Sequence, residues 1–271
     1  MHCKPSLARF EPICLDELNA CARMMTRVDR KYLLTGNEAC ELLASLPQST
    51  RILEINGRFL QHYRTSYLDS SSWGSYFTAA FKRRRRYKVR MRDYVDSGIA
   101  FLEVKTRGPR GTTVKERVPI EVEEAYGDRI PPQRLEPWLA QTLEARRVDV
   151  GAEVGALRPT LRNEYWRATF KPEREGRVTV DSDLRWHSSR GGHLEGLDLV
   201  FVETKSGARP SVVDRQLWAM GLRPQKVSKF GTGLAVMHPE LPSNKWRREM
   251  RTFEAARVSA DVGADIAAPV E

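Results

Sequence analysis

The sequence predicts an α+β protein built on a closed antiparallel β-barrel whose polar interior holds a ligand, with a few flanking helices. Three segments, Lys88–Arg92, Leu102–Lys105 and Val114–Arg117, place charges two residues apart. Residues i and i+2 of a strand share a face, so each segment predicts a strand with one charged and one apolar face. A sandwich buries one sheet face against another, so charged inner faces favour a barrel with a polar interior.

The positive charge of the chain is local. Residues 82–117 contain 13 Lys and Arg against 4 Asp and Glu, a net +9, whereas the whole chain carries +10. Like charges on neighbouring strands repel, so this arrangement indicates a polyanionic ligand. The alternative, charged edge strands that only prevent aggregation, stays open for this stretch taken alone.

The remaining elements follow from hydrophobic periodicity and from turn residues. A strand is expected at residues 27–34, and Asn37 is expected to cap a short helix that ends before Pro47. Further strands are expected at residues 51–55, 61–69, 165–170, 177–181 and 199–205, and further helices at 15–25, 73–80, 133–147 and 210–221. The similar segments FLEVKT (101–106) and FVETKS (201–206) predict two pseudo-symmetric halves of one barrel. We therefore expect a single domain over residues 1–251 and a disordered tail over 252–271.

Several classes of protein are disfavoured. No segment approaches the roughly 18–20 apolar residues that a membrane span needs, and the N-terminus lacks the apolar run of a signal peptide. The four cysteines form no CxxC pair, and there is no Walker-type phosphate loop. A cytoplasmic protein with reduced thiols is expected, and a separate membrane partner is left open.

Nine motifs, in order, resemble the VTC (vacuolar transporter chaperone) domain of polyphosphate polymerases, within the triphosphate tunnel metalloenzyme (CYTH-like) superfamily. They are DRKYLL (29–34), TSYLD (65–69), YKVRMRDY (87–94), FLEVKT (101–106), VKER (114–117), NEYWRATF (163–170), GRVTVDSDL (176–184), FVETKS (201–206) and KVSKF (226–230). The resemblance implies an antiparallel eight-stranded β-barrel tunnel, and the metal-dependent transfer of the ATP γ-phosphate to a growing polyphosphate chain.

The resemblance also implies the residues of the site. Residues expected at the transferred phosphate are Arg90, Arg92, Lys105, Arg167, Arg177 and Lys226. Further phosphate ligands are expected at Lys31, Lys115, Lys205, Ser228 and Lys229, although Lys229 reaches the site only if a turn or helix starts there. Glu203 is expected to bind Mn²⁺ or Mg²⁺, with Glu103 as a weaker candidate. One carboxylate suffices where phosphates supply the other oxygens.

One departure favours polymerisation over hydrolysis. Hydrolytic relatives carry Glu-x-Glu-x-Lys in the first strand, where this chain has Arg27-x-Asp29-x-Lys31. Two alternatives stay open: a tunnel-fold triphosphatase acting on inorganic triphosphate or a nucleoside triphosphate, and a non-catalytic binder of polyanions or nucleic acid. The few aromatic residues among these arginines count against a single-strand binder, so ATP and polyphosphate are the expected partners and nucleic acid is not.

Overall fold

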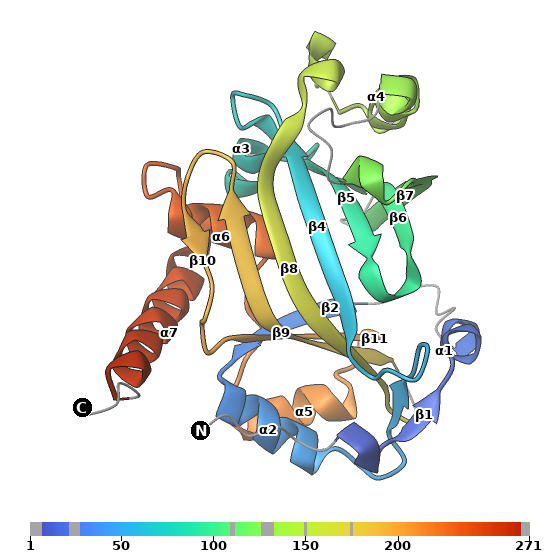
Figure 1. Cartoon of the computed structure of the whole chain (residues 1–271), viewed down its shortest axis with the longest axis vertical. Coiled ribbons are helices and arrows are strands. Elements are labelled where there is room, and N and C mark those ends of the chain that lie inside the picture. The colour runs from blue at the N-terminus through green and yellow to red at the C-terminus, as the bar shows by residue number, and fades with distance from the viewer. Residues whose placement is uncertain are drawn as a thin grey trace.

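One large sheet organises the fold in the computed structural model, which describes residues 7–21, 28–108, 112–125, 133–148, 151–173 and 176–266. Its longer strands are antiparallel to their neighbours and follow the order β2-β11-β9-β8-β4-β5-β6-β7 (Figure 1). Their bounds are β2 Val28–Leu34, β4 Gln61–Asp69, β5 Tyr87–Tyr94, β6 Ile99–Arg107, β7 Thr113–Ile120, β8 Arg158–Lys171, β9 Arg177–Ser188 and β11 Val200–Ser206. The short strands are β1 Glu11–Ile13, β3 Arg51–Leu53 and β10 His193–Leu194.

The predicted closed, eight-stranded barrel is not confirmed. The sheet has 11 strands, and within the described residues no pairing joins β2 to β7, the two ends of the strand order. The outer edge of β2 is instead contacted by an irregular segment, where the Gln225 N–H donates to the Lys31 carbonyl at 2.7 Å. Strand β7 forms the other edge, and its exposed cations Lys115 and Arg117 are typical of edges protected against pairing.

The helices are distributed over both faces of the sheet. Their bounds are α1 Leu15–Cys21, α2 Gly36–Ser45, α3 Gly74–Ala80, α4 Glu136–Ala145, α5 Val212–Ala219, α6 Lys229–Met237 and α7 Arg247–Ile266. Helices α2 and α5 bury Leu42 and Val213 in a cluster with Val202 of β11. Helix α4 buries Leu139 with apolar residues of β5 and β6. None of the helices in the described ranges has both the length and the apolar character needed to cross a bilayer.

The opposite face of the sheet is covered at one end by α3, α6 and α7. Phe230 of α6 packs against Tyr67 of β4 with ring centroids 5.0 Å apart, in a buried cluster that includes Tyr76 of α3 and Phe253 of α7. We call this face of the sheet the inner face. Because α6 occupies only part of it, the rest of the inner face is left for the charged residues described below.

Two local predictions are corrected. Thr35, rather than Asn37, caps α2 through a capping box: the Glu38 N–H donates to Thr35 Oγ1, and the Thr35 N–H donates to Glu38 Oε2. Helix α7 continues where a disordered tail was expected, and Phe253 is fully buried, because α7 packs an apolar face against α6. Residues 267–271 of that expected tail lie outside the described residues.

Candidate functional site

The strand register places most of the predicted site residues on the inner face. Across β5 and β6, Arg90 is opposite Glu103, and across β2 and β11, Lys31 is opposite Glu203. These two pairs lie far apart in the strand order. The charge of Glu203 on β11 nevertheless acts on Lys105 of β6, although β9, β8, β4 and β5 separate the two strands in the sheet. The sheet therefore curls enough to bring its two ends into electrostatic contact.

Glu203 lies between two lysines. Its Oε2 is 2.7 Å from Lys31 Nζ and its Oε1 is 3.3 Å from Lys205 Nζ. Burial raises the pKa of the Glu203 carboxyl, but Lys31 and Lys205 outweigh it and hold the pKa well below its usual range. The side chain keeps 23% of its surface exposed. Glu203 is therefore an ionised carboxylate that still reaches solvent.

Glu103 forms a second, more enclosed cluster. Its Oε2 accepts from Arg90 Nε at 2.7 Å, its Oε1 contacts Lys115 Nζ, and its side chain is fully buried. Burial opposes ionisation, yet Arg90, Arg92 and Lys115 lower the pKa of Glu103 far below the ordinary value. Arg92 also donates to Thr65 Oγ1 of β4 at 3.3 Å. Glu103 therefore holds the Arg90 guanidinium and the Lys115 ammonium in fixed positions, while Thr65 holds Arg92.

Asp181 of β9 forms a third cluster, which the sequence did not reveal as part of a site. Its Oδ2 accepts from Arg167 Nη2 at 2.7 Å and contacts Lys229 Nζ. Burial raises the pKa of Asp181, but Arg167 and Lys229 prevail and lower it to about 2. The sequence pattern did place Asp181 opposite the apolar face of its strand, and that alternation was the available signal.

Lys229 reaches the site because a helix starts there, as its prediction required. Ser228 is the N-cap of α6, and its Oγ accepts from the Gly231 N–H at 2.9 Å. The turn into the helix directs Lys229 toward Asp181 and over the Tyr165 ring, with Nζ 4.6 Å from the centroid. Burial is the main reason that the pKa of Lys229 is lowered, to about 8.

Two further lysines are held close to other cations. The charge of Arg90, together with burial, holds the pKa of Lys105 well below its usual range. Burial and the charges of Lys245, Arg90 and Lys31 lower the pKa of Lys88 to about 7. Lys88 was recognised in the sequence as sharing a face with Arg90 but was not included among the site residues. Such depressed lysines indicate a site that favours an anion.

Three predicted residues are held by contacts with groups other than the three carboxylates, although Arg177 and Ser228 lie next to cluster lysines. Arg177, at the start of β9, is partly exposed and donates to Asn19 Oδ1 of α1 at 3.4 Å. The side chain of Lys226 is exposed, although its N–H is fixed by Glu249 Oε1 at 3.0 Å. The Ser228 hydroxyl oxygen is used in capping α6 and also accepts from Lys88 Nζ at 3.3 Å. The register places Arg177 directly opposite Lys205, at the margin of the Glu203 cluster, whereas the side chain of Lys226 is exposed.

Aromatic rings form the surface beneath the guanidinium groups. The Arg92 guanidinium lies 5.5 Å from the centroid of Tyr63, and that of Arg167 lies 5.0 Å from the same ring. Tyr165 stacks on Tyr63 with centroids 5.3 Å apart. These contacts restrict the rotamers of both arginines, which keeps their donors directed at one region.

A divalent metal fits this donor set only in company with phosphate. Within the described parts of the chain no three His, Cys, Asp or Glu side chains gather into a metal-binding group. Glu103 is enclosed by Arg90 and Lys115, whereas Glu203 is ionised and partly exposed. Glu203 is thus the better ligand of the two, provided that phosphate oxygens complete the coordination and draw Lys31 and Lys205 away.

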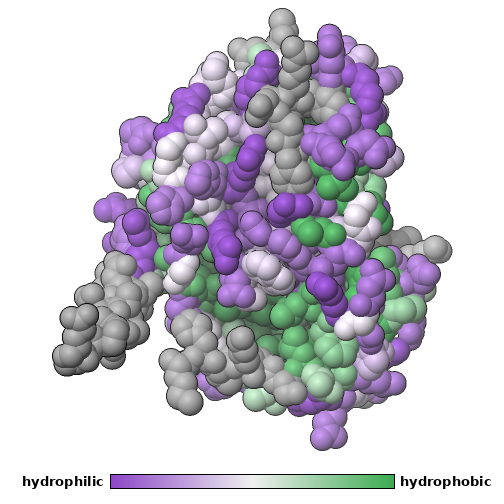
Figure 2. Space-filling model, in the orientation of Figure 1, coloured by the Kyte–Doolittle hydropathy of each residue, from purple (hydrophilic) through white to green (hydrophobic). Residues whose placement is uncertain are grey.

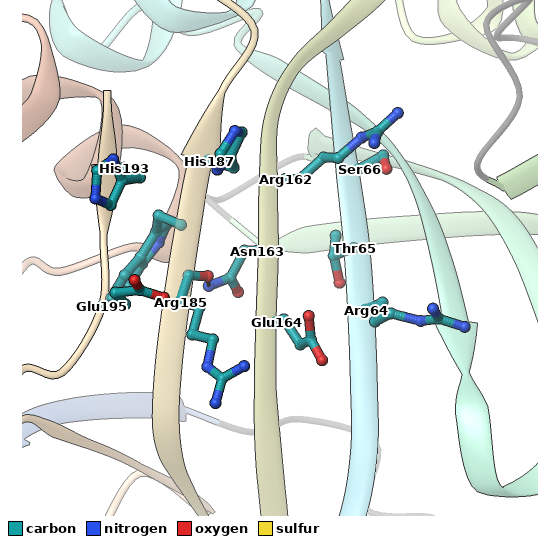
Figure 3. Close-up of a pocket in the computed structure, with 11 residues that line it drawn as sticks. Arg64, Thr65, Ser66, Arg162, Asn163, Glu164, Arg185, His187, His193 and Glu195 are labelled. Atoms are coloured by element: carbon teal, nitrogen blue, oxygen red, sulfur yellow. Dashed lines mark hydrogen bonds between the residues drawn. The ribbon is translucent and has the colours of Figure 1, made fainter. Parts of the chain in front are cut away.

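A separate hollow of about 550 Å³ lies on the outer face of the sheet. Figure 3 shows Arg64 of β4, Glu164 of β8 and Arg185 of β9 side by side there, on the face where Figure 2 shows mainly hydrophilic side chains. None of the predicted site residues lines this hollow. Adjacent strand residues point to opposite faces, so the hollow is separated from the inner clusters by the sheet itself.

Comparison with known proteins gives a family match. The VTC domain family model matches residues 26–238, and no curated protein matches the chain. A proposed adenylyl cyclase from Hippeastrum, described as having a dominant triphosphatase activity, is 16% identical, with a TM-score of 0.49, over 81% of this chain and 100% of that chain. A Pyrococcus horikoshii OT3 protein is 12% identical, with a TM-score of 0.42, over 77% and 98%. The RNA triphosphatase domain of a trifunctional mimivirus mRNA capping enzyme is 9% identical, with a TM-score of 0.30, over 70% and 84%.

Proposed function

Since the chain belongs to the VTC domain family, we propose that it is a polyphosphate polymerase, which transfers the γ-phosphate of ATP to the end of an inorganic polyphosphate chain. The observation that carries the proposal is the convergence of cations from distant strands on one face. Phosphoryl transfer depends on positioning and on charge neutralisation, and it needs little covalent chemistry from the protein. An array of fixed guanidinium and ammonium groups supplies both.

In the proposed reaction, a terminal phosphate oxygen of the polymer attacks the γ-phosphorus of ATP. A new P–O bond forms as the bond between the γ-phosphorus and the β,γ-bridging oxygen breaks, and ADP leaves with that oxygen. In this proposal Arg90 and Arg92 bind non-bridging oxygens, and the contacts of Arg90 with Glu103 and of Arg92 with the Tyr63 ring, which fix the two guanidinium groups, support these roles. Lys31, which pairs with Glu203, is proposed to bind a neighbouring phosphate.

A divalent cation, held by phosphate oxygens and by Glu203, would neutralise charge on the transferred group when bound. The residues of the chain itself orient the two anions. Lys31 and Lys205 share the Glu203 carboxylate, so both ammonium groups would be available to phosphate if that carboxylate bound a metal cation instead. Glu103 would meanwhile keep the Arg90 guanidinium in place.

The carboxylates support transfer to phosphate over transfer to water. A base that removes a proton from the attacking water assists hydrolysis, and an efficient base has a pKa near the working pH. The pKa values of Glu103 and Glu203 are held far below that range, and that of Asp181 is lowered to about 2. A phosphate nucleophile is already ionised at neutral pH and needs no such base. This supports a polymerase over a triphosphatase.

The test is product analysis with purified protein, ATP and Mn²⁺ or Mg²⁺, followed by a gel that separates polyphosphates by length. We expect a ladder of long products and stoichiometric ADP. Orthophosphate as the sole phosphorus product would instead identify a triphosphatase, and binding without ATP turnover would identify a non-catalytic binder. Arg162→Gln, on the exposed outer face, serves as a matched control for Arg90→Gln, since each removes one guanidinium group.

A further inference from the structure

The ratio of carboxylates to cations on the inner face changes along the strands. In one row across β5, β6 and β7, the carboxylate of Glu103 stands between Arg90 and Arg117. In the next row, Lys88, Lys105 and Lys115 stand directly opposite one another, and the carboxylate that Lys115 contacts is Glu103 of the preceding row, which it shares with Arg90. Like charges placed directly opposite each other destabilise a sheet. This lysine row therefore marks an end of the site where an anion has to supply the missing negative charge.

The cations continue outward from this row. The groups whose charges act on Lys88 are Lys245, Arg90 and Lys31, and all of them are cations. Those that act on Lys245 are Lys82, Lys226 and Arg107, again all cations. Exposure rises along this path, because Arg90 is buried, Lys88 and Lys245 are partly buried, and Lys82, Arg107 and Lys226 are exposed.

The path is fixed by the fold. Lys245 Nζ donates to the Ala79 carbonyl at the end of α3 at 2.6 Å and lies 4.8 Å from the centroid of the Trp246 ring. The segment that carries Lys226 is held at both ends, by the bond from Gln225 to the edge of β2 and by Ser228, which accepts from Lys88. Neighbouring lysines repel one another, and a bound anion lowers the free energy of this arrangement by compensating their charge.

We propose that Lys82, Arg107, Lys226 and Lys245 form a cationic rim that binds the polyphosphate chain where it leaves the inner face beyond the lysine row. The proposal rests on the proposed function, because it deepens it by assigning one end of the site to the polymer. It also gives Lys226 a role that differs from the one predicted, namely binding phosphate residues remote from the transferred group. A triphosphate that occupies the inner clusters is too short to require the rim.

The experiment compares binding of tripolyphosphate and of long-chain polyphosphate, without metal, to the full chain. The rim variant is K82Q/K245Q, in which glutamine at residue 245 keeps a donor for Ala79. The control is R162Q/R185Q, which removes the same charge from the exposed outer face. We expect the rim variant to bind the long chain about fivefold more weakly, since exposed ion pairs contribute about 0.2–1 kcal/mol each. Its Kd for tripolyphosphate should stay within about twofold of the wild type.

The salt dependence gives a second readout. The slope of log Kd against log salt for the long chain should become shallower by about 2 in the rim variant, because about two fewer counterions are released. The control should keep both the long-chain affinity and the tripolyphosphate affinity. An unchanged long-chain affinity in the rim variant, or an equal loss for both anions, would overturn the rim. A wild-type protein that binds neither anion would overturn the proposed function itself, which separates the two failures.

Discussion

Lys88 is expected to make anion binding depend on pH. The effect can be measured as the number of protons that the protein takes up when it binds the anion. Burial and three neighbouring cations, Lys245, Arg90 and Lys31, lower the pKa of Lys88 to about 7 in the free protein, and Lys88 Nζ donates to Ser228 Oγ at 3.3 Å. A phosphate oxygen in contact with Nζ favours the charged form, so binding raises this pKa again. Binding above pH 7 is therefore expected to take up a proton at Lys88.

The magnitude follows from the pKa. At pH 8.5 about 3% of a lysine with a pKa of about 7 is charged, so full charging in the complex takes up about one proton. If only the charged form binds, the apparent Kd rises about 30-fold from low pH to pH 8.5. The free energy of unfolding shows the opposite trend with pH. The unfolded chain holds this proton up to a pH of about 10.5, whereas the folded chain releases it near 7, so stability rises between these values.

The assay is calorimetric titration with tripolyphosphate at pH 8.5, repeated in buffers that differ in ionisation enthalpy, which counts the protons exchanged. Lys88→Arg is the matched variant, because arginine remains charged at this pH and takes up no proton. Protonation of the ligand and of Lys105 or Lys229 is common to both proteins, so it cancels in the difference. Wild type should take up about one proton more than the variant. Equal uptake by the two proteins would refute the reasoning.

Three substitutions test the carboxylate clusters and their arginines. Glu203→Gln should abolish transfer while leaving thermal unfolding nearly unchanged, since Glu203 is partly exposed; full activity would exclude Glu203 from the site. Arg90→Ala should lower kcat by about 10²-fold or more, measured as ADP release, and a loss below about twofold would contradict its placement at the transferred phosphate. Asp181→Asn leaves Arg167 and Lys229 buried without a counter-charge and should lower the free energy of unfolding by about 3–5 kcal/mol. Tripolyphosphate should restore much of this loss. Denaturant unfolding that shows no loss of stability in the variant would count against the Asp181 cluster.

The sequence predicted the inner face well because its signal is local. Alternation at i and i+2 is a property of each strand separately, and it placed Arg90 and Arg92 on one face of their strand and Glu103 and Lys105 on one face of theirs, as the register bears out. The family assignment from nine ordered motifs is confirmed by the match over residues 26–238. The assigned roles of the individual residues stay predictions until the variants are measured.

The parts that the sequence missed depend on contacts between distant segments. Asp181 became a partner of Lys229 only because α6 starts at that residue and crosses back over β9. The opening between β2 and β7 depends on the segment around Gln225, which contacts β2 without forming a strand. Thr35 and Asn37 were both acceptable caps by residue type, and the placement of Glu38 relative to Thr35 decided between them.

The same charges explain why the inner face carries more basic than acidic side chains in the free protein. Each of the three inner carboxylates is shared between two or more cations, so the basic side chains outnumber their counter-charges before any ligand binds. The pKa values of Lys88, Lys105 and Lys229 are lowered, so these three lysines lose their positive charge more easily than a free lysine does. A bound anion that restores those charges stabilises the folded chain by mass action, by about 2.7 kcal/mol at a hundred times its Kd. A more complete set of carboxylates would make the free protein more stable, but it would compete with phosphate for the same donors.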